Sequence, residues 1–153
     1  MTSLCLTPAE VRAALTGAEF EVRRKVKPQP TLSEGKTALW YDAKAYLWRN
    51  DDQYARDCSP FTPGTVLCGK ETWCPARPGS YEPMEKSLFD WSKYYVCPVY
   101  RSEYPYSSSD YDGHWRSAAT MPKWASRLSL EVLTVRCENQ DGVWWWVAKV
   151  RRK

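Results

Sequence analysis

One carboxylate in an otherwise apolar stretch is the residue best suited to chemistry. Pro63-Gly64 predicts a turn, and the residues from Val66 to Trp73 read as a strand. Because side chains alternate between the faces of a strand, Glu71 shares its face with Leu67 and Trp73, and this should be the inward face. A carboxylate loses hydration there, so it must find a cation or take up a proton. Glu71 is therefore the candidate functional residue.

Two roles are open for Glu71. As a functional group it would act as a base or accept a hydrogen bond from a ligand amine. As a structural group it would form a buried ion pair with Arg23 or Arg24 and hold two strands together. We favour the ion pair, because these two arginines stand side by side in the predicted second strand.

Basic and aromatic residues suggest a second kind of site. The net charge of +4 is unevenly spread: positions 23–27 contribute +4, residues 117–153 contribute +4 from seven basic and three acidic residues, and the rest of the chain contributes −4. The chain also has nine Trp and ten Tyr against three Phe, which suits contacts with bases or partners. A polyanion partner is one reading, and solvated charge around an aromatic core is the other. The candidate nucleic-acid contacts are Arg23, Arg24, Lys27, Lys70, Trp73, Trp115, Arg116, Lys123, Trp124 and Arg127.

One short helix is expected ahead of these strands. Thr7 can cap it, Pro8 suits its first position, and Glu10 completes a capping box. Its apolar face would consist of Val11, Ala14 and Leu15, and Gly17 would end it.

The remaining pattern predicts strands separated by irregular segments. Strands are expected over residues 3–6, 20–26, 94–101, 127–132 and 143–150, the last after a hairpin turn at Asp141-Gly142 and apolar on both faces. We expect a partly ordered excursion over 31–62, in which 37–48 is strand or short helix, and loops over 74–90 and 102–113. Mostly antiparallel strands with one or a few short helices indicate an α+β or barrel-like fold, and 153 residues suit a single domain.

Composition limits the setting of the protein. We expect neither a membrane span nor a secretory signal, since the chain has no long apolar run and no basic start followed by one. Six cysteines without a CxxC pair indicate reduced thiols and a cytoplasmic location. We expect no cofactor and no metal, because the spacing of Cys58, Cys68 and Cys74 is not that of a zinc knuckle.

Several segments together resemble a phage and prophage family related to the activating-signal-cointegrator homology (ASCH) domains. The similar segments are Val11 to Gly17, Arg23 to Pro30, Pro63-Gly64 through Trp73, Met121 to Leu128, and Val143 to Val147 as a closing strand. The resemblance implies a single ASCH domain over residues 1–153, folded as a small PUA-like β-barrel with a cleft for nucleic acid or a modified nucleoside.

The resemblance also implies that the chemistry of some ASCH-like enzymes is lost. Those enzymes hydrolyse acetylcytidine with a Lys, a Thr three residues later and a distant Glu. Glu71 matches the Glu, but Glu19 stands at the position of the Lys and Val22 at that of the Thr. A valine offers no nucleophile and Glu19 inverts a charge. Glu71 would be catalytic only if an altered chemistry persists.

Three functions follow as hypotheses. The first is a non-catalytic module, phage-derived as its resemblance implies, that binds RNA, single-stranded nucleic acid or a nucleotide. The second is a phage-encoded inhibitor that binds a host defence protein. The third is an amidohydrolase or ribonuclease with an altered site around Glu71, Glu21, Lys70 and Lys25.

Overall fold

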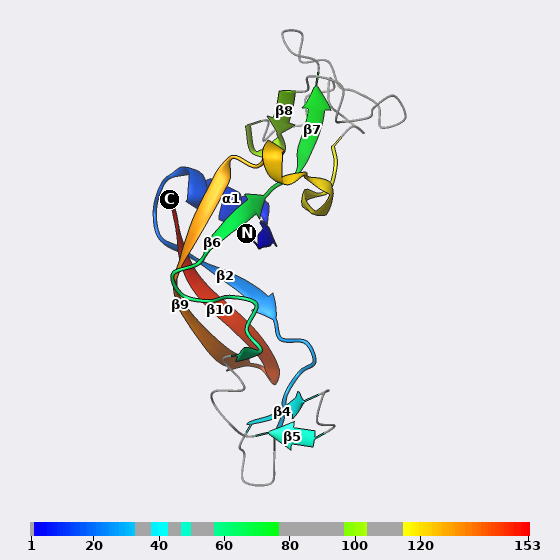
Figure 1. Cartoon of the computed structure of the whole chain (residues 1–153), viewed down its shortest axis with the longest axis vertical. Coiled ribbons are helices and arrows are strands. Elements are labelled where there is room, and N and C mark those ends of the chain that lie inside the picture. Colours follow the sequence, from blue (N-terminus) through cyan, green and yellow to red (C-terminus); the bar gives the residue numbers. More distant parts are fainter. Residues whose placement is uncertain (1, 33–37, 43–46, 50–56, 77–96, 104–114) are drawn as a thin grey trace. The chain divides into compact units, whose positions relative to one another are not determined.

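A computed structural model describes residues 2–32, 38–42, 47–49, 57–76, 97–103 and 115–153, which form a small, mainly β structure with one α-helix (Figure 1). The described strands form a five-stranded sheet in the order β1-β6-β9-β10-β2, a three-stranded sheet β3-β4-β5 and a two-stranded sheet β7-β8. The bounds are β1 Ser3–Cys5, α1 Pro8–Leu15, β2 Phe20–Lys25, β3 Thr31–Leu32, β4 Ala38–Asp42, β5 Leu47–Arg49, β6 Val66–Lys70, β7 Trp73–Ala76, β8 Cys97–Tyr100, β9 Leu128–Gln140 and β10 Val143–Arg152, with 3₁₀ turns η2 Arg101–Glu103, η4 Ala118–Thr120 and η5 Lys123–Ala125.

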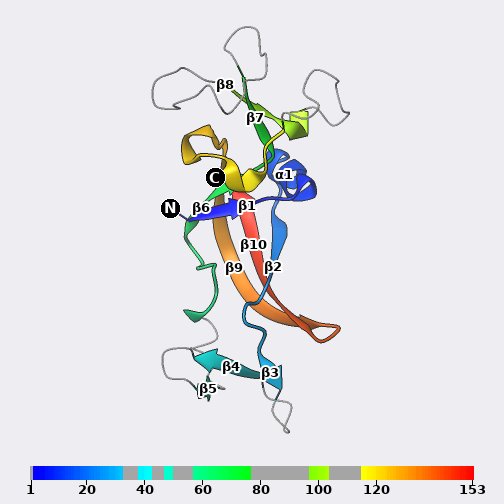
Figure 2. The same ribbon diagram turned by 90° about the vertical axis from the view of Figure 1, so that its right-hand side faces the viewer.

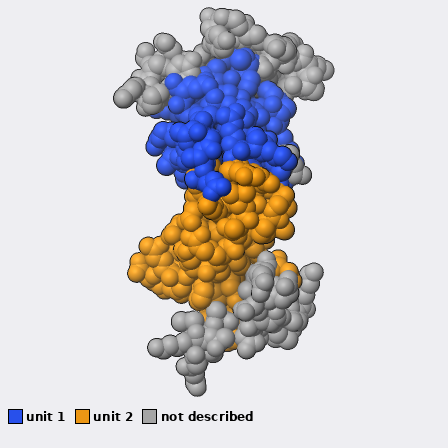
Figure 3. Space-filling model, turned by 90° about the vertical axis from the view of Figure 1, so that its left-hand side faces the viewer, with its two compact units in different colours: residues 1–19, 66–130, 152–153 blue, residues 20–65, 131–151 orange. Residues whose placement is uncertain are grey.

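The chain divides into two compact units, coloured in Figure 3. Unit 1 comprises residues 1–19, 66–130 and 152–153, and unit 2 comprises residues 20–65 and 131–151. Strand β9 begins in unit 1 and continues into unit 2. Each unit is described by itself below.

Helix α1 of unit 1 forms as its sequence predicts. The Thr7 hydroxyl accepts a hydrogen bond from the Glu10 amide, and the Glu10 carboxylate accepts one from the Thr7 amide at 2.7 Å. Val11 and Ala14 are buried, but Leu15 is 36% exposed, so its predicted place on the apolar face is wrong. The helix ends at Leu15, and Gly17, the predicted stop, follows two residues later with a positive φ of 75°.

Strand β6 is the central strand of unit 1. It pairs in parallel with β1, so that Leu4 lies opposite Gly69, and it is followed in the sheet by β9. A methyl group at Gly69 would lie 2.9 Å from Leu128 Cβ and 2.9 Å from Leu6 Cδ1. Because Gly69 has no side chain, Leu6, in the segment between β1 and α1, and Leu128, at the start of β9, can both lie close to this strand.

The strand predicted from Val66 to Trp73 is interrupted. Strand β6 ends at Lys70 and β7 starts at Trp73, with Glu71 and Thr72 between them. The loop predicted from Cys74 is wrong for residues 74–76, because β7 continues to Ala76 and pairs antiparallel with β8. The rest of that predicted loop, and most of the one over 102–113, lie outside the described residues.

The hairpin of β9 and β10 belongs largely to unit 2 (Figure 2). Its turn is the predicted Asp141-Gly142 pair, with φ of 52° and 78° as the tight hairpin turn requires. Strand β10 lies between β9 and β2, which explains why it is apolar on both faces. Ala148 and Val22 are register partners, and both are fully buried.

Three short strands occupy part of the predicted excursion over 31–62. The described part of 37–48 is strand, not helix: Trp40 in β4 lies opposite Arg49 in β5. The Trp40 ring stacks on Trp146 with centroids 5.3 Å apart. This contact explains why an aromatic residue of the excursion is buried.

The coarse class, a small α+β fold, is confirmed, whereas barrel closure is not. The five-stranded sheet has β1 at one edge and β2 at the other, and no pairing among the described residues joins these edges. Parallel pairing of β1 with β6 also differs from a purely antiparallel arrangement.

Candidate functional site

Glu71 is buried, as predicted, although it lies in the break between β6 and β7. Its exposed fraction is 2%, and among the described residues it is the one polar or charged residue in the buried class. Its Oε1 accepts from Arg127 Nε at 2.9 Å, and its Oε2 accepts from Ser102 Oγ at 2.6 Å. Burial of the carboxylate is thus compensated by one cation and one hydroxyl.

The predicted partner of Glu71 is wrong. Arg23 instead binds Glu138 at 3.1 Å and Gln140 at 2.9 Å, and Arg24 donates to the carbonyl of Arg23. The cation that compensates Glu71 comes from the segment between η5 and β9. The sequence favoured Arg23 and Arg24 of the predicted second strand as partners. These two arginines belong to unit 2, whereas Arg127 belongs to unit 1, as Glu71 does.

Arg127 is the centre of a network in unit 1. Its guanidinium also donates to Ser102 Oγ at 2.8 Å and pairs with Glu103, and it lies over the Tyr100 ring at 3.9 Å. Burial lowers the pKa of Arg127, but the hydrogen bond and charge of Glu71 outweigh burial and raise that pKa overall. Burial raises the pKa of Tyr100, whose hydroxyl donates to the Ala125 carbonyl at 2.8 Å. Both residues therefore keep their protons at neutral pH.

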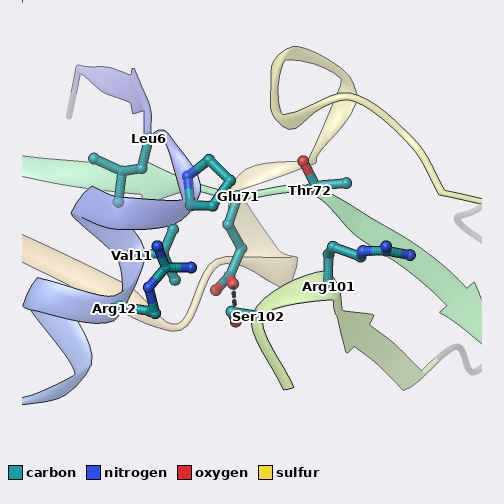
Figure 4. A pocket seen from close by; sticks show the side chains of 8 residues that line it. Leu6, Val11, Arg12, Glu71, Thr72, Arg101 and Ser102 are labelled. Carbon is teal, nitrogen blue, oxygen red and sulfur yellow. Dashed lines mark hydrogen bonds between the residues drawn. The ribbon is translucent and has the colours of Figure 1, made fainter. Parts of the chain in front are cut away.

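A cavity of about 230 Å³ lies beside Glu71. Leu6, Pro8 and Val11 form its apolar wall. Its polar lining consists of Arg12, Glu71, Thr72, Arg101 and Ser102. In Figure 4 the Glu71 carboxylate points toward Ser102, Arg12 extends from α1 on the same side, and the Arg101 side chain points away from Glu71. The guanidinium of Arg101 lies 5.2 Å from the centre of the Trp115 ring.

A surface cluster of Trp73, Arg116, Lys123 and Trp124, here called the Trp124 patch, also belongs to unit 1. Trp124 is 53% exposed and meets Trp73 edge to face, with centroids 6.4 Å apart and an angle of 88°. The Arg116 guanidinium lies 6.0 Å from the centre of the Trp73 ring. Trp73 itself is 1% exposed, so only Trp124 offers a ring face to a ligand.

The other predicted contacts are distributed over both units. Arg23, Arg24 and Lys27 lie in unit 2, on β2 and just after it, whereas Lys70 and Trp115 lie in unit 1 and are half-buried. Arg127 is held in the Glu71 network rather than presented on the surface. The structure therefore brings together Trp73, Arg116, Lys123 and Trp124 out of the predicted set.

Sequence reasoning missed Ser102 and Glu103 as partners of Arg127, because 102–113 reads as a surface loop, and it gave Tyr100 no role beyond the predicted strand 94–101. The signal that existed was the Ser-Glu pair directly after a predicted strand, where η2 begins. Arg12 was assigned only to a helix, and its place at the cavity depends on the packing of α1.

Among the described residues, no three His, Cys, Asp or Glu side chains gather as a metal site would require. Nor does the described part of the chain contain a helix of the length and apolarity that crossing a membrane demands. No protein-family model matches the chain, and no curated protein or solved structure matches it either.

Proposed function

We propose that the chain is a non-catalytic module that binds RNA, single-stranded nucleic acid or a nucleotide through the Trp124 patch. The observation that carries the proposal is an indole ring 53% exposed that meets Trp73 edge to face, with Lys123 next to it in sequence and the Arg116 guanidinium at the Trp73 ring. An exposed aromatic face with cations nearby is the arrangement with which proteins stack an unpaired base and contact its phosphates.

The geometry assigns distinct roles within the patch. Trp73 is buried, and its ring packs edge to face against the exposed ring of Trp124. This contact holds the Trp124 ring in place, so that it can serve as a stacking surface for a base. Lys123 is exposed and adjacent to Trp124 on η5, where it is suited to a phosphate contact. Arg116 pairs with Trp73 in an isolated antiparallel β-bridge, and its guanidinium lies over the Trp73 ring. It would add a second positive charge to the patch.

The absence of catalysis is part of the proposal. The acceptor atoms of Glu71 already bind Arg127 and Ser102, which leaves this carboxylate poorly suited to abstract a proton from a substrate. Glu19 and Val22, at the positions of the Lys and Thr in ASCH-like amidohydrolases, supply neither a cation nor a nucleophile. The ASCH-like, phage-derived character of the chain and a PUA-like barrel arrangement belong to the same proposal and rest on the sequence resemblance.

Titration of a fluorescein-labelled 12-nucleotide uridine RNA and its DNA equivalent, followed by anisotropy between 50 and 200 mM salt, tests the proposal. We expect affinity to fall as salt rises, and Trp124→Ala to weaken binding by about 1–3 kcal/mol, the loss of one stacked base. Lys123→Gln should reduce the magnitude of the salt slope by about 0.7, the value for one phosphate on a single strand.

The matched control is Arg152→Gln, an exposed arginine near the end of β10 that makes the same charge change elsewhere. It should leave both affinity and slope nearly unchanged. Absence of binding to either oligonucleotide, or salt-insensitive binding that Trp124→Ala does not alter, would reject the proposal and favour a protein partner for the exposed ring.

A further inference from the structure

The cavity beside Glu71 is separate from the residues of the Trp124 patch, and its charges are unequal. Its lining holds two arginines, Arg12 and Arg101, and one carboxylate, Glu71. The charge of Glu71 is already balanced by Arg127, whose other partner Glu103 lies outside the lining. Neither lining arginine has a carboxylate within 4.0 Å among the described residues. The cavity therefore carries excess positive charge.

We propose that this cavity binds a small organic anion, a carboxylate or phosphate group on a short apolar chain, with Arg12 as its anion-binding residue. Arg12 extends from α1 on the side where Glu71 lies (Figure 4), and its planar guanidinium can hold two oxygens of such a group. At the start of α1, the amides of Glu10 and Thr7 already donate to the Thr7 hydroxyl and the Glu10 carboxylate, so these two amides do not compete for the anion. Arg101 adds positive charge from farther away, since its guanidinium lies over Trp115.

The apolar wall of the cavity indicates the chemistry of the uncharged part of the ligand. Leu6, Pro8 and Val11 offer no hydrogen bond from their side chains, so they suit a short hydrocarbon segment. The hydroxyl groups of Thr72 and Ser102 lie at the same cavity and can orient a polar atom. At about 30 Å³ for each non-hydrogen atom with its hydrogens, a volume of about 230 Å³ holds roughly eight such atoms. Butyl phosphate is about this size, and most drug-like ligands are larger.

Chemical-shift titration of the ¹⁵N-labelled chain with sodium butyrate and with n-butyl phosphate tests the inference. Saturable shifts are expected for at least one of the two, at the backbone amides of Thr72 and Ser102 and at Arg12 Nε–Hε. The two probes separate carboxylate from phosphate recognition. Butanol should give no saturable shift, and inorganic phosphate should bind at least threefold more weakly than the better organic probe.

Arg12→Gln should weaken binding at least tenfold, because a charge-assisted pair is lost. Arg12 is exposed and glutamine is a good helix former, so the variant should fold, as its amide spectrum will show. Arg101→Gln should weaken binding less than Arg12→Gln. Lys123→Gln makes the same charge change at the Trp124 patch and should alter binding less than twofold.

Several results would overturn the inference. They are the lack of saturable shifts with both organic anions, affinity unchanged in Arg12→Gln, an equal loss in Lys123→Gln, or inorganic phosphate binding as tightly as butyl phosphate. The test is independent of nucleic-acid binding, since Trp124→Ala should bind the small anions as the parent chain does.

Discussion

Arg127 and Glu71 are 56 positions apart in the chain, and the guanidinium meets the carboxylate through Nε at 2.9 Å from Oε1 and Nη2 at 3.4 Å from Oε2. The two side chains are unequally buried, with exposed fractions of 23% for Arg127 and 3% for Glu71. Removing one partner therefore has different consequences from removing the other.

Arg127→Gln should lower the free energy of unfolding by about 3–5 kcal/mol, because it leaves a buried carboxylate without its cation. Glu71→Gln should also destabilise the fold, but less, since Arg127 keeps Glu103 and some solvent contact. Urea unfolding followed by tryptophan fluorescence measures both values.

The matched control for this pair is Glu131→Gln, which removes the more exposed ion pair with Arg151 and should cost less than about 1 kcal/mol. Equal losses for Glu131→Gln and Arg127→Gln would contradict the structural role of the buried pair. An unchanged midpoint in Glu71→Gln together with lost ligand binding would instead make Glu71 a functional group.

Gly69→Ala should destabilise the protein by about 1–3 kcal/mol through overpacking. The added methyl group would press on Leu128 Cβ and Leu6 Cδ1, each 2.9 Å away, and on the Leu128 carbonyl at 3.3 Å. Thermal unfolding measures the effect. Gly64→Ala is the informative comparison, because its methyl would meet nothing within 4 Å and only its positive φ of 80° opposes the change. Leu6→Ala removes the Cδ1 atom that the added methyl would meet, so Gly69→Ala with Leu6→Ala should cost less than the sum of the two single changes, and strict additivity would refute the steric explanation.

Thr7→Ala should lower the free energy of unfolding by about 1 kcal/mol through loss of the capping box. Thr7→Ser, which keeps the hydroxyl, should retain most of that stability. Thr2→Ala changes another exposed threonine outside the helix and should stay within about 0.5 kcal/mol of the parent chain. A denaturation series on the three variants decides whether the cap, and not the loss of a threonine in general, accounts for the effect.

The thiol of Cys137 should react slowly with iodoacetamide at pH 8. Burial, and then the charge of Glu138, raise its pKa from 9.0 to about 11, and the thiolate is the reactive form. Two pKa units correspond to roughly 100-fold less thiolate at pH 8 than an ordinary thiol has, and the rate should rise as pH approaches 11. Peptide mass spectrometry compares Cys137 with exposed Cys58 in the same sample. Equal rates at pH 8 would contradict the expectation.

Local signals in the sequence were sufficient for most secondary structure. The Thr7–Glu10 capping box, the Asp141-Gly142 turn and the alternation of Leu128, Leu130 and Val132 all depend on neighbours within a few residues, and all three are confirmed. Burial of Glu71 was predicted for the same reason, since it follows from the alternation of strand faces.

Long-range pairing could not be predicted in the same way. The choice of Arg127 over Arg23 as the partner of Glu71 depends on which strands become neighbours, and strand order is not encoded in periodicity. The break at Glu71 and Thr72 was missed because both residues fit the alternating pattern, whereas their hydrogen bonds go elsewhere: the Thr72 carbonyl accepts from the Arg101 amide.

The side chain of Gln29 makes hydrogen bonds that main-chain groups make elsewhere in the sheet. Its carboxamide donates to the carbonyls of Val26 and Trp144, at 2.6 and 3.1 Å, and accepts from the Trp144 amide at 2.7 Å. It thereby imitates a peptide group where proline leaves the second strand without a further donor. A carboxamide joins a donor and an acceptor in one planar group, so the main chain at Trp144 in β10 accounts for the glutamine at position 29.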